Sequence, residues 1–150
     1  MKTLSLKEPW VTCIFRHGKR TENRRWLPPS WLIGKRIAIH ASKKPEPRDV
    51  YAYAAKLAGV KLQGDVLGLE SGYCGHVVAT AVLAGYVQVD EQLRVNVIHA
   101  PSWYVPAEDV WLVREPGNSG WILEDVQALD APIPAKGQLG FWDFDLGVRL

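Results

Sequence analysis

The 150-residue sequence predicts an α+β fold, a small mixed β-barrel with helices at its ends. Segments with strand character outnumber the two convincing helical segments, so the chain lacks the regular alternation of a doubly wound fold. With 47% hydrophobic and 23% charged residues, the composition is typical of a soluble globular protein. The length suits a single domain over residues 1–150 with a core of its own.

Two helices are expected. The first begins at Pro9, which suits a first helical turn, and runs to His17, where Gly18 stops it. The second covers residues 49–58, where apolar residues recur at helical spacing, and Gly59 caps it.

The longest expected strand covers residues 75–89 and bends near Gly85. The stretch from Ser71 to Val89 has no charged residue, which would also suit a membrane span. Its polar residues, glycines and many valines favour a doubly buried central strand instead.

The other expected strands are shorter. Residues 121–129 and 138–144 are expected to pair as a closing hairpin. The segment 94–99 is either a strand or a variable insertion. The remaining strands are expected at residues 3–6, 21–25 and 35–40.

Charge is unevenly distributed along the chain. Residues 1–48 hold twelve Lys/Arg and three acids, whereas residues 49–150 hold six Lys/Arg and thirteen acids. This asymmetry predicts one basic face and a negatively charged partner. The alternative is that folding intermixes the two parts and leaves an even surface.

Several classes of protein are disfavoured. Cys13 and Cys74 are too few for a disulfide framework or a thiolate metal site, and the four histidines show no ligand spacing, so neither a metal nor a cofactor is expected. No phosphate-binding glycine loop of the Walker or dinucleotide type is present. The first residues lack the apolar region of a secretory signal, so we expect a cytoplasmic protein, away from membranes. The sequence leaves the oligomeric state open, with a monomer favoured.

Residues 16–25 hold five Lys/Arg against the single acid Glu22. In an extended strand Glu22 and Arg24 share one face, so they must pair or stay hydrated if that face is covered. One interpretation is a binding site. The other is a fixed ion pair that supports the fold.

Several blocks of sequence occur in an order that resembles the ASCH domain family. The segment Lys19-x-x-Glu22-x-Arg24 is followed by Trp26, and Gly140-Phe141-Trp142 lies near the end of the chain. The other blocks are residues 4–10, 36–42, 120–126 and 132–137. The resemblance implies a fold of the PUA-like superfamily, a group of small nucleic-acid-associated barrels.

The resemblance also implies a groove beside the barrel, lined by Lys19 and Arg24. Lys19 would contact phosphate or act as a base or nucleophile, and Glu22 would accept from the amino edge of a base. Trp26 is the tryptophan most expected to stack on a base. The candidate nucleic-acid-binding residues are Lys19, Arg20, Glu22, Arg24, Arg25, Trp26, His40, Ser42, Lys43 and Lys44. For His40, a structural role bonded to the backbone is an equal alternative.

The function expected is a module that binds RNA, single-stranded DNA or a modified nucleoside in this basic groove. The alternative is a small hydrolase acting on RNA or acylated cytidine, with Lys19 and Glu22 as its catalytic residues. Some ASCH proteins resemble acetylcytidine amidohydrolases, in which a lysine and a threonine three residues later act together. Lys19 matches that lysine, but Glu22 stands at the threonine position and Thr21 is one residue away.

Overall fold

The computed structural model describes residues 1–61 and 73–147. These residues hold two α-helices, seven strands and two short 3-10 helices, which confirms the α+β class. The elements are β1 (Lys2–Leu6), α1 (Trp10–Arg16), β2 (Thr21–Arg24), η1 (Ser30–Leu32), β3 (Arg36–Ala41), α2 (Arg48–Ala58), β4 (His76–Val89), β5 (Val95–His99), η2 (Pro106–Glu108), β6 (Ser119–Pro134) and β7 (Phe141–Asp143).

The chain divides into two compact units. Unit 1 comprises residues 1–18, 36–81 and 126–150, and unit 2 comprises residues 19–35 and 82–125. The strands β4 and β6 contribute to both units. Hydrogen-bonded neighbours follow the order β2-β6-β4-β3-β1-β7, and β5 also pairs with β4. That residues 1–150 form one domain stays a prediction.

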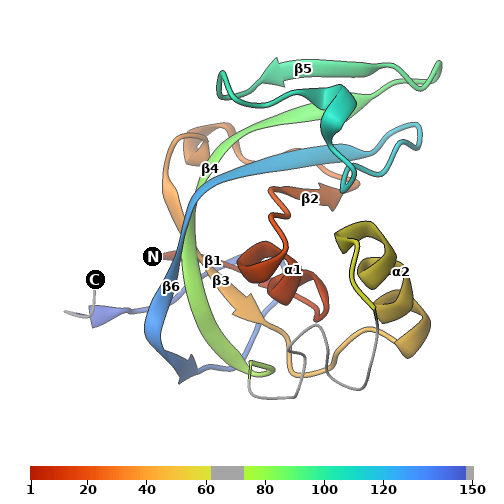
Figure 1. Ribbon diagram of the computed structural model, residues 1–150. Coiled ribbons are helices and arrows are strands. Elements are labelled where there is room, and N and C mark those ends of the chain that lie inside the picture. The colour runs from red at the N-terminus through yellow and green to blue at the C-terminus, as the bar shows by residue number, and fades with distance from the viewer. Residues whose placement is uncertain (62–72, 148–150) are drawn as a thin grey trace. The chain divides into compact units, whose positions relative to one another are not determined.

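In unit 1, β1 pairs with β3 in parallel, with Leu4 opposite Ile39. One buried cluster of this unit brings Ala38 and Val77 together with Trp142 and Leu146. The helices α1 and α2 contact each other and both belong to this unit (Figure 1). Both helices lie where the sequence predicts them.

The expected closing hairpin is wrong. β7 pairs antiparallel with β1, whereas β6 has β2 and β4 as its neighbours. The end of β6 contains Pro132 and Pro134, which have no backbone N–H to donate to a strand on that side. β7 pairs with β1 instead, and the side chains of Lys2 and Asp143, opposite each other in this register, form an ion pair with 3.1 Å between Nζ and Oδ1. The alternation of apolar and polar residues indicated which segments are strands, but not which strands are hydrogen-bonded to each other.

In unit 2, β2 and β5 each pair antiparallel with a long strand, β2 with β6 and β5 with the C-terminal part of β4 (Figure 1). β2 was expected as a strand, and for residues 94–99 the structure shows the strand that was one of the two expectations. Gly85 has a φ of +155°, and a Cβ placed there would lie 2.1 Å from the carbonyl oxygen of His99. The pairing of β4 with β5 shifts register between Tyr86 and Val87, which confirms the predicted irregularity near Gly85.

Residues 76–89 of the uncharged stretch from Ser71 to Val89 form β4, in which most side chains from Val77 onward are buried. This confirms the central strand, although residues 71 and 72 of the stretch lie outside the described part of the chain. Among the described residues, no helix has the length and apolar character needed to cross a membrane.

Candidate nucleic-acid interface

β2 carries the motif that the sequence singled out, and β6 fixes its register. Glu22 lies opposite Trp121, and Arg24 lies opposite Ser119. The period of two in a strand therefore places Glu22 and Arg24 on one face and Thr21 and Asn23 on the other, as expected.

Glu22 lies between two cations of unit 2. Its Oε2 is 3.3 Å from the Nζ of Lys19, and its Oε1 is 3.7 Å from the Nε of Arg24. The Lys19 ammonium also donates to the carbonyl oxygen of Thr21. Lys19 is only 2% exposed and Glu22 9% exposed, whereas Arg24 is half-buried. The carboxylate thus compensates a buried ammonium and positions the more accessible guanidinium.

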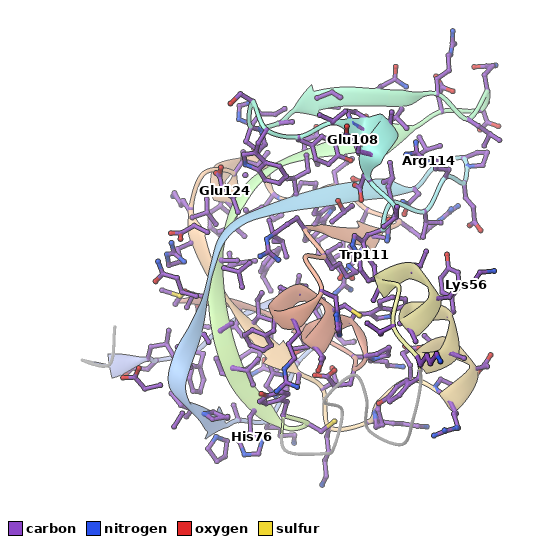
Figure 2. The ribbon with its side chains drawn as sticks, in the orientation of Figure 1. Lys56, His76, Glu108, Trp111, Arg114 and Glu124 are labelled. Carbon is purple, nitrogen blue, oxygen red and sulfur yellow. The ribbon has the colours of Figure 1, made fainter. Side chains whose placement is uncertain are left out.

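Asn23, on the opposite face of β2, ties the segment that precedes β6 to the strand. Its Nδ2 donates to the carbonyl oxygen of Trp111, and its Oδ1 accepts from the backbone N–H of Val113 and the Nδ2 of Asn118, each at 2.9 Å. All three bonds lie within unit 2, whose residues Trp111 and Arg114 are labelled in Figure 2. Sequence reasoning missed this role, because the partners are about ninety residues apart.

A second network on that face centres on Asp109. Its Oδ2 accepts from the hydroxyl of Thr21 at 2.5 Å and from the hydroxyl of Tyr104 at 2.6 Å, and its Oδ1 accepts from the backbone N–H of Trp111 at 3.0 Å. Burial, followed by the bond to Asp109, raises the pKa of Tyr104. No local sequence pattern indicated Asp109 or Tyr104. Together these groups hold the loop after β5 against the start of β2.

Arg25 and Trp26 follow β2 and are both exposed. The Nη1 of Arg25 donates to the carbonyl oxygen of Pro116 at 3.1 Å. The indole of Trp26, 41% exposed, meets that of Trp121 edge-to-face with 4.6 Å between ring centroids, and the Nε1 of Trp121 donates to the carbonyl oxygen of Trp26. Fully buried Trp121 thereby anchors an exposed indole, and the residue before it in the sequence, Arg25, is also exposed.

Arg20 differs from these exposed groups. It is half-buried, and its Nη1 donates to the carbonyl oxygen of Lys19 at 2.9 Å. Burial lowers the pKa of Arg20 from its ordinary value. Since it borders the buried Lys19, this guanidinium adds positive charge next to the ion-paired motif.

His40 lies in unit 1, is 1% exposed, and has both ring nitrogens engaged. Its Nε2 lies 2.9 Å from the carbonyl oxygen of Ala135, which can only accept, so Nε2 carries the proton. The neutral ring then accepts at Nδ1 from the hydroxyl of Ser5 at 3.0 Å, and that oxygen accepts in turn from the Nε1 of Trp142. Burial lowers the pKa of His40. This geometry favours the structural alternative, because a ligand could reach His40 only by breaking one of these bonds.

The loop that follows β3 carries the remaining predicted residues. Lys43 and Lys44 are exposed, whereas Ser42 is half-buried and its backbone N–H donates to the carbonyl oxygen of Leu6. These residues belong to unit 1, and residues 19–26 belong to unit 2. The motif residues Lys19, Glu22 and Arg24 come together as an ion-paired cluster. That both sets line one groove stays a prediction.

The expected separation of charge does not hold for the units. Unit 2 combines the basic segment 19–35 with the acidic segment 82–125, and it holds seven Lys/Arg and eight Asp/Glu. Some of its acids are engaged within the unit: Asp90 pairs with Arg94, and Glu124 accepts from the Nε1 of Trp103. The fold therefore intermixes the two parts of the sequence, and positive charge is concentrated only locally.

Comparison with known proteins agrees with the resemblance seen in the sequence. The family model described as "ASCH domain" matches residues 4–108. Among solved structures, the crystal structure of ASCH from Zymomonas mobilis is similar, with 20% identity over 89% of this chain and 72% of that one and a TM-score of 0.47. No curated protein matches. The family match agrees with the predicted resemblance, and the mixed sheet and two α-helices confirm the predicted α+β class. Since the matched residues make up most of the sequence, the chain belongs to the ASCH domain family.

Proposed function

We propose that this domain binds RNA or single-stranded DNA, and that residues Arg24 to Trp26 at the end of β2 form the principal contact. The observation that carries the proposal is the exposed indole of Trp26, anchored on Trp121 and preceded in the sequence by exposed Arg25. An exposed aromatic ring stacks on any unpaired base, and a neighbouring cation binds the adjoining phosphate. Members of the ASCH family are generally thought to bind RNA, which supports the same class of partner.

The buried motif supports this surface from behind. Lys19 is enclosed and donates to Glu22, so it has little access to a phosphate, whereas Arg24 on the other side of the carboxylate is more accessible. We infer that Lys19 and Glu22 fix the direction of Arg24, and that Arg24 and Arg25 make the phosphate contacts. Exposed Lys43 and Lys44 are proposed as further phosphate contacts.

The alternative, a hydrolase that uses Lys19, receives less support from the geometry. The ammonium is engaged as a donor to a carboxylate and to a backbone carbonyl, whereas a base or nucleophile needs a free nitrogen directed at its substrate. Binding of a modified nucleoside stays within the proposal, since Trp26 offers the same stacking surface to an isolated base.

The test is a titration with a labelled single-stranded RNA, the matching DNA and a duplex, between low and moderate salt. We expect affinity for the single strands to fall steeply as salt rises, because phosphate contacts release counterions. Trp26→Ala and Arg25→Ala should both weaken binding. The matched controls are Trp103→Ala, which alters another exposed indole of unit 2, and Arg94→Ala, whose guanidinium already pairs with Asp90.

Parallel incubation with acetylated cytidine and short RNAs, comparing the unaltered protein with Lys19→Ala, tests the hydrolase. If the unaltered protein hydrolyses either substrate and Lys19→Ala does not, the protein is an enzyme that uses Lys19. No binding to any single strand at low salt would refute the binding module.

A further inference from the structure

Unit 1 presents a second exposed surface that combines aromatic and cationic side chains, on α2 and the loop before it. Along the helix the exposed residues include Asp49, Ala52, Tyr53 and Lys56. Spacings of three and four residues place these four on one helical face. Lys56 is labelled on α2 in Figure 2. The face is unusual for a solvated helix because a tyrosine lies at its centre.

Tyr53 is 51% exposed, yet its ring is held in place. It meets the indole of Trp10 edge-to-face, with 6.4 Å between ring centroids and 80° between the ring planes. Trp10 is the first residue of α1 and is itself half-buried. A ring that is fixed by a neighbouring ring and half open to solvent loses little entropy when it stacks on a ligand.

Three contacts hold the basic loop beside this aromatic pair. The Nζ of Lys7 lies 3.7 Å from the Oε1 of Glu46, and the backbone N–H of Glu46 donates to the carbonyl oxygen of Glu8 at 2.8 Å. The backbone N–H of Trp10 donates to the carbonyl oxygen of Lys7 at 3.0 Å. The loop that carries exposed Lys43 and Lys44 is thus fixed against the residues that lead into Trp10.

The charge of this surface is positive. Residues 43–61 hold five Lys/Arg and two acids. One of the acids, Glu46, is paired with Lys7, which leaves Asp49 as the other acid of the segment. From Arg48 to Lys56 the helix extends about 12 Å. Over that length one nucleic-acid strand carries roughly three to four phosphates. A membrane surface fits less well, since the exposed face of α2 offers Ala52 and Tyr53 and no large aliphatic side chain.

We propose that this α2 surface, formed by Trp10, Lys43, Lys44, Arg48, Tyr53 and Lys56, binds single-stranded nucleic acid, with Tyr53 stacking on one base and the cations contacting the phosphates on either side. The inference rests on the proposed function and adds a base-stacking residue outside the ASCH motif segment. It also commits to an unpaired strand, because the bases of a duplex are not free to stack on a side chain.

The test compares Tyr53→Ala and Tyr53→Phe with the unaltered protein, using the same short single-stranded RNA and a duplex of equal length. Tyr53→Ala should weaken single-strand binding about 5- to 100-fold at every salt concentration. The slope of log affinity against log salt should be the same in Tyr53→Ala as in the unaltered protein, because no phosphate contact is lost. Tyr53→Phe keeps the ring and should bind normally.

The cations are tested by their salt dependence. Arg48→Ala and Lys56→Ala should each reduce the slope of log affinity against log salt by about 0.7. Lys136→Ala, which removes an exposed lysine of unit 1 outside this surface, serves as the control and should leave the slope unchanged. Circular dichroism of each variant verifies that α2 remains folded.

The outcomes separate the two proposals. If Trp26→Ala weakens binding while folded Tyr53→Ala binds as tightly as the unaltered protein, the α2 surface is refuted and the β2 site stands. If Tyr53→Ala loses as much affinity for the duplex as for the single strand, the inference is also overturned, because stacking on an unpaired base would then not be the cause. If the unaltered protein binds no strand at all, the proposed function itself fails.

Discussion

The hydroxyl of Thr21 donates to the carboxylate of Asp109 at 2.5 Å, which joins two residues 88 positions apart in the sequence. Thr21 is 1% exposed and begins β2, and Asp109 also accepts from Tyr104 and from the backbone of Trp111. The strand that carries the ASCH motif is therefore held by a loop that contributes nothing to the motif itself.

Asp109→Ala should destabilise the protein, because it leaves the hydroxyl of Thr21 buried without its acceptor. The expected loss in the free energy of unfolding is about 2–4 kcal/mol. Thr21→Val, which keeps the shape and leaves Asp109 its other two donors, should cost about 1–2 kcal/mol. Urea unfolding measures both changes. A loss below about 0.5 kcal/mol in Asp109→Ala, the range of ordinary surface substitutions, would show that the network does not stabilise β2.

Glu22→Leu should be strongly destabilising, because it leaves the ammonium of Lys19 buried without its carboxylate. Removing one partner of a buried pair costs about 3–5 kcal/mol. Adding Lys19→Met to Glu22→Leu should recover much of that loss, because neither charge then remains uncompensated. A double-mutant cycle from urea unfolding measures the coupling, and strictly additive losses would contradict the buried pair.

Glu8 makes stability depend on pH. Its carboxyl group is 1% exposed, and burial raises its pKa to about 7 despite the opposing bonds from Thr12 and the charge of Arg16. Within the described residues its Oε1 has no hydrogen-bond partner. The folded state therefore holds a proton that the unfolded state has released above the ordinary pKa of 4.5. The contribution of Glu8 to the free energy of unfolding should fall as pH rises from 4.5 to 7, by about 3 kcal/mol in total.

Glu8→Gln removes this titration and keeps the shape of the side chain. The variant should no longer lose stability between pH 5 and pH 8, and should be the more stable protein at pH 8. Because burial lowers the pKa of His40, the variant should even gain some stability over this interval. Glu46→Gln, at a partly exposed carboxylate of the same unit, is the control and should retain the fall. If Glu8→Gln loses stability with pH as the unaltered protein does, another group is responsible.

Gly85→Ala should detach β5 from β4. A Cβ at this position would lie 2.1 Å from the carbonyl oxygen of His99, so one of the two backbones must move. Gly34→Ala is the matched control, because Gly34 also has a positive φ, of +87°, but nothing within 4 Å of the added carbon. We expect amide hydrogens of residues 95–99 to exchange faster only in Gly85→Ala. Unchanged protection there would show that the bend does not require glycine.

Local patterns predicted the elements of this fold well and their partners poorly. α2 follows from apolar residues at helical spacing before Gly59, which adopts the left-handed conformation expected of a cap. β4 follows from the valine-rich uncharged stretch. The pairing of β7 with β1 was missed because a period of two specifies a face and not a neighbour.

The candidate site shows the same limit. That Glu22 and Arg24 share a face follows from their spacing along one strand, so their pairing could be predicted. The contact of Glu22 with Lys19, which precedes the strand, could not be predicted in this way. Asp109, Tyr104 and Asn118 could not, because their bonds join segments whose approach depends on the whole chain. His40 lies at the end of a strand before a basic loop, and only tertiary packing determines that its ring is enclosed by Ser5 and Ala135.

The continuity of β4 and β6 through both units constrains how this chain can change in length. Inserting or deleting one residue near Ala81 or Asp125 would reverse, on one side of the change, which side chains face inward and which face outward. The two units therefore cannot vary independently through these strands, and added or lost residues are better accommodated in the turns. Dividing the protein into separately expressed halves would require cutting through both strands.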